Sequence, residues 1–423
     1  MDIAASSPRQ RPSEQPPKAV SLGLDWNPRD IPSGSTTRNV ALRTRDEAAT
    51  NGTLYLPSGG SRTVVCIMHP REFMANHYLV PDILEAGLAA WTQGSRSAGN
   101  DLRLEHEIAL FDVAAGLCFL RDIGFEKIVL LGNSGGGGLY CLYAQQCRLA
   151  PEARIAKTPG GRPTNLDTLQ MPQVDGMVLL APHPGQGALL LQCIDPSVAN
   201  EADPLSVIPE LDPFAPANGF VDSPNSSTYA AEFVQRYRRA QVDRVKRIDT
   251  AAKHAIAERR AARKRANDSG DPMDLRKGAH APIITIWRTD ADLRCYDLSL
   301  DPSDRHYGSV WGSNPLTSNY GSVGFARLCS PEAWLSTWSG ASSNALLSKT
   351  APSITLPTLM IEYTGDQSCF PNICQDIFAA IGASDKRRER VRGDHHGRPL
   401  SPEDEPGRYV AGRIIQSWLR ERY

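Results

Sequence analysis

The chain has 423 residues, of which 41% are hydrophobic, and its formal net charge at pH 7 is -1. This length is sufficient for one large domain or two smaller ones. The balance of charge argues against a dedicated nucleic-acid-binding protein. No run of 18 or more apolar residues occurs in the sequence, so we expect no membrane-spanning segment.

The cysteines and the first residues bear on the cellular compartment. The nine cysteines are an odd number and form no metal-type CxxC pairs, which favours reduced thiols in a cytoplasmic protein without a metal site. The opening stretch "MDIAASSPRQRPSEQPPKAV" lacks the apolar region of a secretory signal. Because Pro, Ser, Gln and charged residues dominate it, we interpret residues 1–37 as a disordered tail.

Residues 38–182 alternate between strand and helix patterns. Short apolar or alternating runs predict strands, and apolar residues spaced by about 3.6 predict helices. The predicted strands cover residues 39–46, 51–57, 63–69, 88–93, 127–132 and 174–182, and the predicted helices cover 76–87, 103–124 and 137–149. Strands alternating with helices indicate an α/β fold with a mostly parallel sheet.

The alternation of strand and helix patterns stops at residue 183 and returns after residue 353, so we interpret residues 183–353 as an insertion. A long helix is predicted over residues 230–266. Its apolar stripe comprises Tyr237, Gln241 or Val242, Val245, Ile248, Ala252 and Ile256. Its basic face is explained most simply as a solvated surface, with an anionic partner as the alternative. A β-hairpin is predicted over residues 281–300. Arg288 and Arg294 flank its bend, either as exposed charges or as a carboxylate site.

Residues 354–423 resume the α/β pattern. Strands are predicted over residues 356–366 and 387–393, and helices over 372–382 and 406–423. The sheet is therefore expected to consist of residues 38–182 together with residues 354–423.

One serine lies among glycines directly after a predicted buried strand, in "GNSGG" at residues 132–136. A sharp strand-to-helix turn would expose the Ser134 hydroxyl, and small residues at Gly132 and Gly136 would let strand and helix approach. The N–H of Gly135 would then face the oxyanion of an acyl-transfer reaction. A phosphate loop would need Gly-Lys-Ser/Thr, a dinucleotide fingerprint does not fit the spacing, and a plain flexible glycine loop is the alternative.

A nucleophilic serine needs a base, and the base needs an orienting acid. Asp366 follows the predicted strand 356–366, and His395 and His396 follow the next strand in "GDHH". Both turns would lie at the carboxyl edge of the sheet. We predict Ser134, Asp366 and His395 as the catalytic residues, with His396 as the alternative base and Glu362 as the alternative acid.

A second oxyanion donor is expected from the loop after the strand at 63–69. Pro70 has no N–H, so we predict the backbone N–H of Arg71, with Glu72 as substitute. His69 either supports this loop or is an ordinary packed histidine.

These pieces resemble the α/β-hydrolase family. The resemblance rests on "MHP" where His-Gly is usual, on "GNSGG", and on the "TGD" and "GDHH" loops, and it covers residues 38–182 and 357–423. It implies an eight-stranded, mostly parallel, doubly wound sheet, hydrolysis without a cofactor, and a cap or lid subdomain at residues 183–353. Pro70 departs from the usual glycine in the oxyanion loop.

A serine nucleophile favours hydrolysis of a carboxylic ester of a small, partly apolar or aromatic substrate through an acyl-enzyme. Carbon–carbon (β-diketone type), thioester or amide hydrolysis, acyl transfer to another acceptor, and a non-catalytic ligand-binding protein remain alternatives. The aromatic residues of the insertion either line the cleft or form the core of the cap, and the candidates for substrate binding are Trp311, Tyr320 and Trp338. The expected partner is a small-molecule substrate, not nucleic acid or a membrane, and a homo-oligomer is left open.

Overall fold

The centre of the molecule is one eight-stranded sheet with the order β1-β2-β4-β3-β5-β6-β9-β10. The computed structural model describes residues 31–322 and 324–423, so most of the predicted tail lies outside it. β2 pairs antiparallel with β1 and with β4, and the other neighbours in the sheet are parallel. The strands are β1 (Thr36–Arg43), β2 (Ala49–Leu56), β3 (Thr63–Met68), β4 (Ala89–Gln93), β5 (Lys127–Asn133), β6 (Gly176–Leu180), β9 (Thr358–Tyr363) and β10 (Lys386–Val391). The predicted mostly parallel sheet is confirmed.

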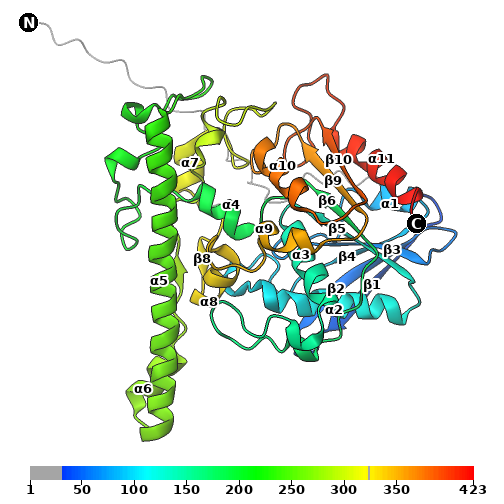
Figure 1. Ribbon diagram of the computed structural model, residues 1–423, viewed down its shortest axis with the longest axis horizontal. Coiled ribbons are helices and arrows are strands. Elements are labelled where there is room, and N and C mark those ends of the chain that lie inside the picture. Colours follow the sequence, from blue (N-terminus) through cyan, green and yellow to red (C-terminus); the bar gives the residue numbers. More distant parts are fainter. Residues whose placement is uncertain (1–30, 323) are drawn as a thin grey trace, which may run out of the picture.

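Helices cover both faces of this sheet (Figure 1). One face carries α1 (Val80–Glu85) and α11 (Gly407–Arg420), and the other carries α2 (His106–Asp122), α3 (Gly135–Arg148) and α10 (Pro371–Ala380). Successive residues of a strand point to opposite faces. Val65 and Leu131 accordingly pack in the core under α1 and α11, whereas Cys66 and Leu130 pack under α2 and α3. All four are fully buried, which explains the continuous apolar runs in these strands.

The segment 183–353 packs beside the sheet, and α5 (Ala231–Ser269) runs as a long rod along one side of the molecule (Figure 1). The predicted apolar stripe of this helix is buried at Tyr237, Val245 and Ile248, whereas Val242 is 38% exposed. The other elements of the segment are α4 (Gln186–Cys193), α6 (Pro272–Ala279), β7 (Ile284–Thr285), α7 (Pro315–Tyr320), β8 (Leu328–Cys329), α8 (Pro331–Ala333), a π-helix (Trp334–Trp338) and α9 (Leu347–Thr350).

The predicted hairpin over residues 281–300 is wrong. β7 pairs antiparallel with β8 instead, and Leu293–Cys295, within the predicted hairpin, forms a 3-10 helix capped by Asp292. Arg288 is buried, donates to the Tyr320 hydroxyl at 2.8 Å, and lies 3.6 Å from Asp195. Arg294 is paired with Asp292 at 2.6 Å. Both guanidiniums therefore already have partners within this chain and are not exposed hairpin charges.

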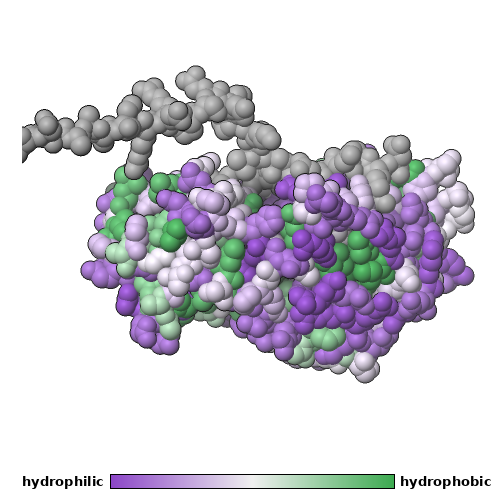
Figure 2. Space-filling model, turned by 90° about the horizontal axis from the view of Figure 1, so that it is seen from above, coloured by the Kyte–Doolittle hydropathy of each residue, from purple (hydrophilic) through white to green (hydrophobic). Residues whose placement is uncertain are grey.

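The surface shows no single dominant apolar face in the view of Figure 2, where hydrophilic residues surround smaller apolar patches. Among the residues that the structure describes, no helix combines the length and apolar character needed to span a bilayer.

The aromatic residues of the insertion differ in their burial, so those that form its core can be distinguished from those nearer its surface. Trp334 is fully buried in the core of the insertion, and its Nε1–H donates to Asp249 at 2.7 Å. We expect Trp334→Ala to lower the free energy of unfolding by about 3–5 kcal/mol, because it leaves a cavity and removes one of the two hydrogen bonds to the buried Asp249 carboxylate, the other being donated by Ser339. Trp311→Ala, at a half-buried position, is the matched control and should cost clearly less. Urea denaturation followed by fluorescence measures both, and equal losses would contradict this assignment.

Candidate active site

Ser134 lies at a strained turn between β5 and α3. Its backbone has φ 51° and ψ -120°, a conformation that L-residues rarely adopt. The turn is held by the Ser134 N–H, which donates to the Leu180 carbonyl at 2.9 Å. The Asn133 side chain donates to the same carbonyl at 3.1 Å. The predicted nucleophile elbow is therefore present as a local structure.

The glycines at both ends of this motif allow close backbone approach. A Cβ on Gly132 would lie 2.6 Å from the Gly137 Cα, and a Cβ on Gly136 would lie 2.5 Å from the Met68 carbonyl oxygen. Such separations are far below van der Waals contact, so strand β5, helix α3 and the end of β3 meet only because these side chains are absent.

The structure brings Ser134, His395 and Asp366 together from distant parts of the sequence. Ser134 Oγ lies 3.0 Å from His395 Nε2, and His395 Nδ1 lies 2.8 Å from Asp366 Oδ2. The other oxygen of Asp366 accepts the N–H groups of Ser368 and Cys369 at 2.6 and 2.9 Å. Both His395 and Asp366 are buried. This geometry allows a proton to pass from the hydroxyl to the imidazole.

Backbone contacts between two loops position the acid and the histidine. Directly after β9, the Thr364 and Gly365 N–H groups each donate at 2.9 Å, to the carbonyls of Val391 and Gly393 respectively. The histidine lies in a tight turn in which the Gly397 N–H donates to the Asp394 carbonyl at 2.8 Å. The parallel pairing of β9 and β10 brings these two loops to the same edge of the sheet.

The two adjacent histidines have opposite electrostatic environments. Burial by itself lowers the pKa of His395, but the Asp366 carboxylate outweighs it and the pKa is raised above its ordinary value. Burial and the neighbouring His395 lower the pKa of His396 to about 3. The rings of the two histidines lie edge to face with centroids 5.1 Å apart, and it is His395 that contacts Ser134. The geometry therefore favours His395 over His396 as the base.

Glu362, the alternative acid, is directed elsewhere. Its carboxylate is buried in β9 and pairs with the guanidinium groups of Arg388 and Arg390 on β10. Arg390 is opposite Glu362 in the parallel ladder, and Arg388, two residues earlier, lies on the same face of the sheet.

The two predicted oxyanion donors, the N–H groups of Gly135 and Arg71, differ in whether they already donate a hydrogen bond. The Gly135 N–H is the first of helix α3 and has no acceptor among the described residues. The N–H groups of Arg71 and Glu72 instead donate to His69 Nδ1, at 3.1 and 2.9 Å. The loop after β3 therefore holds the His69 ring. The role of the Arg71 N–H as an oxyanion donor stays a prediction. It requires this N–H to give up its hydrogen bond to His69 and to donate to the oxyanion instead.

The side chain of Arg71 links the loop after β3 to the insertion. Its guanidinium forms two hydrogen bonds of 2.8 Å with Asp101 and lies 5.4 Å from the ring centroid of Trp338. Of the candidates for substrate binding, Trp338 is fully buried, Trp311 is half-buried, and Tyr320 is 38% exposed. Their contact with substrate stays a prediction.

Sequence reasoning named His69 as a residue that could support the loop after β3, but it missed two further polar residues beside Ser134, His183 and Gln186. A Cβ on Gly135 would lie 2.5 Å from Gln186 Nε2, 2.6 Å from His69 Nε2 and 3.0 Å from His183 Nε2. His106 is a buried neighbour of Gln186. The stretch "PHPGQG" directly after the strand β6 was the available signal, because this strand ends at the same sheet edge as β5.

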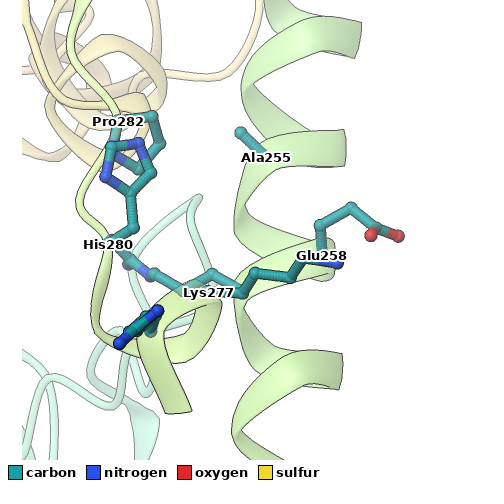
Figure 3. Close-up of a pocket in the computed structure, with 7 residues that line it drawn as sticks. Ala255, Glu258, Lys277, His280 and Pro282 are labelled. Atoms are coloured by element: carbon teal, nitrogen blue, oxygen red, sulfur yellow. The ribbon is translucent and has the colours of Figure 1, made fainter. Parts of the chain in front are cut away.

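A hollow of about 420 Å³ lies away from these residues, between α5 and α6 (Figure 3). Ala255 and Glu258 of α5 form one wall, and Lys277, His280 and Pro282 form the other. None of the predicted site residues lines it.

Comparison with known proteins identifies the fold. No protein-family model and no curated protein matches the sequence. Among solved structures, the complex of DcsB with its substrate analogue matches with a TM-score of 0.50 at 13% identity, over 91% of this chain and 99% of that chain. The α/β hydrolase GrgF from Penicillium matches with a TM-score of 0.45 at 14% identity, over 91% and 96%. An esterase domain from a Rhodothermus marinus protein matches with a TM-score of 0.42 at 10% identity, over 91% and 98%.

Together with the strand order, the likeness to the DcsB structure shows that the chain has the α/β-hydrolase fold, as the sequence resemblance implies. At 13% identity this likeness concerns the fold alone, because one fold supports many activities.

Two glycines of α3 provide a test of the packing beside Ser134. We expect Gly135→Ala to destabilise the protein by about 1–3 kcal/mol, because the new methyl group would overlap three buried polar side chains. Gly137→Ala is the control: its Cβ would lie 3.4 Å from the nearest side chain, and alanine favours the helix by up to about 1 kcal/mol. Thermal unfolding of both variants decides, and a Gly135→Ala protein as stable as Gly137→Ala would show that the site is open there.

Proposed function

We propose that the protein is a serine hydrolase that cleaves a carboxylic ester through an acyl-enzyme. The observation that carries this proposal is the hydrogen-bonded chain from Ser134 Oγ through the His395 ring to Asp366. A serine alone is a weak nucleophile, and this arrangement supplies both the base and the group that orients it.

The hydrogen bonds define the role of each nitrogen of His395. Nδ1–H donates to the Asp366 carboxylate, so the lone pair of Nε2 accepts the Ser134 hydroxyl. As Ser134 Oγ attacks the ester carbonyl, Nε2 takes its proton, and the Asp366 carboxylate stabilises the imidazolium that forms. The Gly135 N–H, at the start of a helix, stabilises the oxyanion.

The tetrahedral intermediate collapses when the imidazolium returns its proton to the leaving alkoxide oxygen. The products of this half-reaction are an alcohol and the Ser134 ester. Water then attacks the acyl-enzyme with His395 again as base, which releases the carboxylic acid and restores the hydroxyl.

Mutation of the two adjacent histidines tests which of them is the base. We expect His395→Ala to lower kcat for a p-nitrophenyl ester by roughly three or more orders of magnitude, because the residues of such a unit act together. His396→Ala is the matched neighbour and should cost much less. A fluorophosphonate probe should label the native protein but not Ser134→Ala. Absence of labelling in the folded native protein would refute the enzyme assignment, and the reverse order of the two histidine variants would refute the choice of base.

The raised pKa of His395 predicts a specific pH dependence. Because the base acts in its neutral form, kcat/KM should fall as the pH drops through the pKa of His395, which the Asp366 carboxylate raises above that of an ordinary histidine. Asp366→Asn removes the carboxylate that raises this pKa, so the acidic limb should move to lower pH while the plateau falls by roughly 10³–10⁴-fold. A pH–rate profile of both proteins measures this, and an unchanged limb in Asp366→Asn would mean that another group is the base.

A further inference from the structure

Four buried side chains form what we call the Gly135 polar cluster: His69, His106, His183 and Gln186. They are between 0% and 4% exposed and come from the loop after β3, from the start of α2, from the loop after β6, and from the start of α4. Three of them place a side-chain nitrogen within 3.0 Å of the position that a Cβ of residue 135 would take. These nitrogens lie beside the first residue of α3, next to Ser134.

The hydrogen bonds of two rings determine their tautomers. His69 Nδ1 accepts the N–H groups of Arg71 and Glu72, and His183 Nδ1 accepts the Gly185 N–H at 3.2 Å. Because Nδ1 is the acceptor in both rings, the hydrogen of each neutral imidazole is on Nε2. Neither Nε2–H has a partner among the described residues, so both donors are available beside Gly135.

The other two members supply acceptors as well as a donor. The Thr337 hydroxyl donates to the Leu104 carbonyl at 2.6 Å, so His106 Nδ1, 3.1 Å from that hydroxyl, is the donor to it. This leaves the lone pair of His106 Nε2 as an acceptor. His106 Nε2 and both polar atoms of the Gln186 amide are buried without a hydrogen-bond partner in the described structure. Leaving such groups unsatisfied costs about 1–3 kcal/mol each.

The three histidines are neutral at physiological pH. Burial lowers the pKa of His69 far below its ordinary value, that of His183 to about 3, and that of His106 to about 4. The guanidinium of Arg71, whose charge acts on His69, is paired with Asp101. A buried carboxylate would lack a counter-charge here. The cluster therefore suits a neutral oxygen.

The cluster is within reach of the reacting acyl group. From the Cβ separations and covalent geometry, Gln186 Nε2, His69 Nε2 and His183 Nε2 each lie within about 5–6 Å of the Gly135 nitrogen. An oxyanion held by the Gly135 N–H would thus have a second polar site about one or two bonds further along the acyl chain.

We propose that the Gly135 polar cluster binds a hydroxyl group of the acyl portion, so that the substrate is an ester of a 2-hydroxy or 3-hydroxy acid. A hydroxyl is chosen because it is both an acceptor and a donor of hydrogen bonds. Its oxygen can accept from the Nε2–H groups of His69 and His183. Its hydrogen can be donated to Gln186 Oε1 or to His106 Nε2. This inference rests on the proposed ester hydrolysis and specifies its substrate class.

The test compares phenyl esters of butyric, 2-hydroxybutyric, 3-hydroxybutyric and 3-oxobutyric acid. The quantity measured is the ratio of kcat/KM for each oxygenated ester to that for the butyrate. A site that hydrogen-bonds a substrate hydroxyl discriminates strongly against analogues without it, so we expect one hydroxy ester to be favoured at least about tenfold. The better of the two hydroxy esters locates the hydroxyl, and a preference for the 3-oxo ester over both would overturn the hydroxyl assignment.

Variants separate binding by the cluster from the intrinsic reactivity of each ester. His183→Asn removes the Nε2–H, while the Asn oxygen is still placed to accept the Gly185 N–H. Gln186→Leu removes both amide groups at similar volume. Each should reduce the preference for the hydroxy ester about tenfold, whereas His254→Asn, the same replacement at an exposed position on α5, should leave the ratio unchanged. Equal ratios in all variants would overturn the proposal.

A binding measurement distinguishes failure of this inference from failure of the proposed function. Isothermal titration of Ser134→Ala with phenyl butyrate and the two hydroxybutyrates requires no turnover. Tighter binding of a hydroxy ester supports the cluster as a subsite even if the chemistry proves different. Equal binding of all three refutes it even if esters are hydrolysed.

Discussion

The arrangement of the whole site depends on the left-handed backbone of Ser134. Holding a non-glycine residue there costs on the order of 1–3 kcal/mol, and the surrounding contacts must offset that cost. Gly132 and Gly136 let β5, α3 and the end of β3 approach to distances that a single methyl group would forbid. The same turn places Ser134 and Gly135, the proposed nucleophile and oxyanion donor, next to each other at the start of α3. The parallel sheet then brings the loops after β6, β9 and β10 to this edge.

The insertion is tied to the core by buried polar contacts, and these contacts lie next to the site. The His106 N–H donates to the Ser336 hydroxyl at 2.9 Å, and Asn344 donates to Glu107 at 2.8 Å. The π-helix of Trp334–Trp338 is therefore anchored to the start of α2, and Arg71 reaches the same aromatic cluster from the loop after β3. Since α4 follows directly from the sheet, Gln186 is held between core and insertion. Movement of the insertion relative to α2 would consequently change the surroundings of Gly135.

Sequence patterns predicted the sheet and the juxtaposition of Ser134, Asp366 and His395, because these depend on local signals. An apolar strand, a glycine-flanked serine and an acid-then-histidine order each lie within a few residues. The hairpin at residues 281–300 failed because β7 finds its partner more than forty residues further on, at β8. The partners of the Arg71 N–H were equally beyond prediction, since they depend on the rotamer of His69. The polar residues beside Gly135 come from four elements, and no single stretch of sequence records their convergence.

His69 and His183, in the loops after β3 and β6, each hold their own loop with one ring nitrogen and place the other beside Gly135. Each uses Nδ1 to accept backbone N–H groups of its own loop, which fixes the ring orientation and forces the remaining hydrogen onto Nε2. Burial then keeps the ring neutral, so it donates one directed hydrogen bond without bringing a charge close to His395. A lysine or arginine at these positions would lower the pKa of the base through charge repulsion. Neutral donors therefore provide polarity beside Ser134, and the Asp366 carboxylate remains the group that raises the pKa of His395.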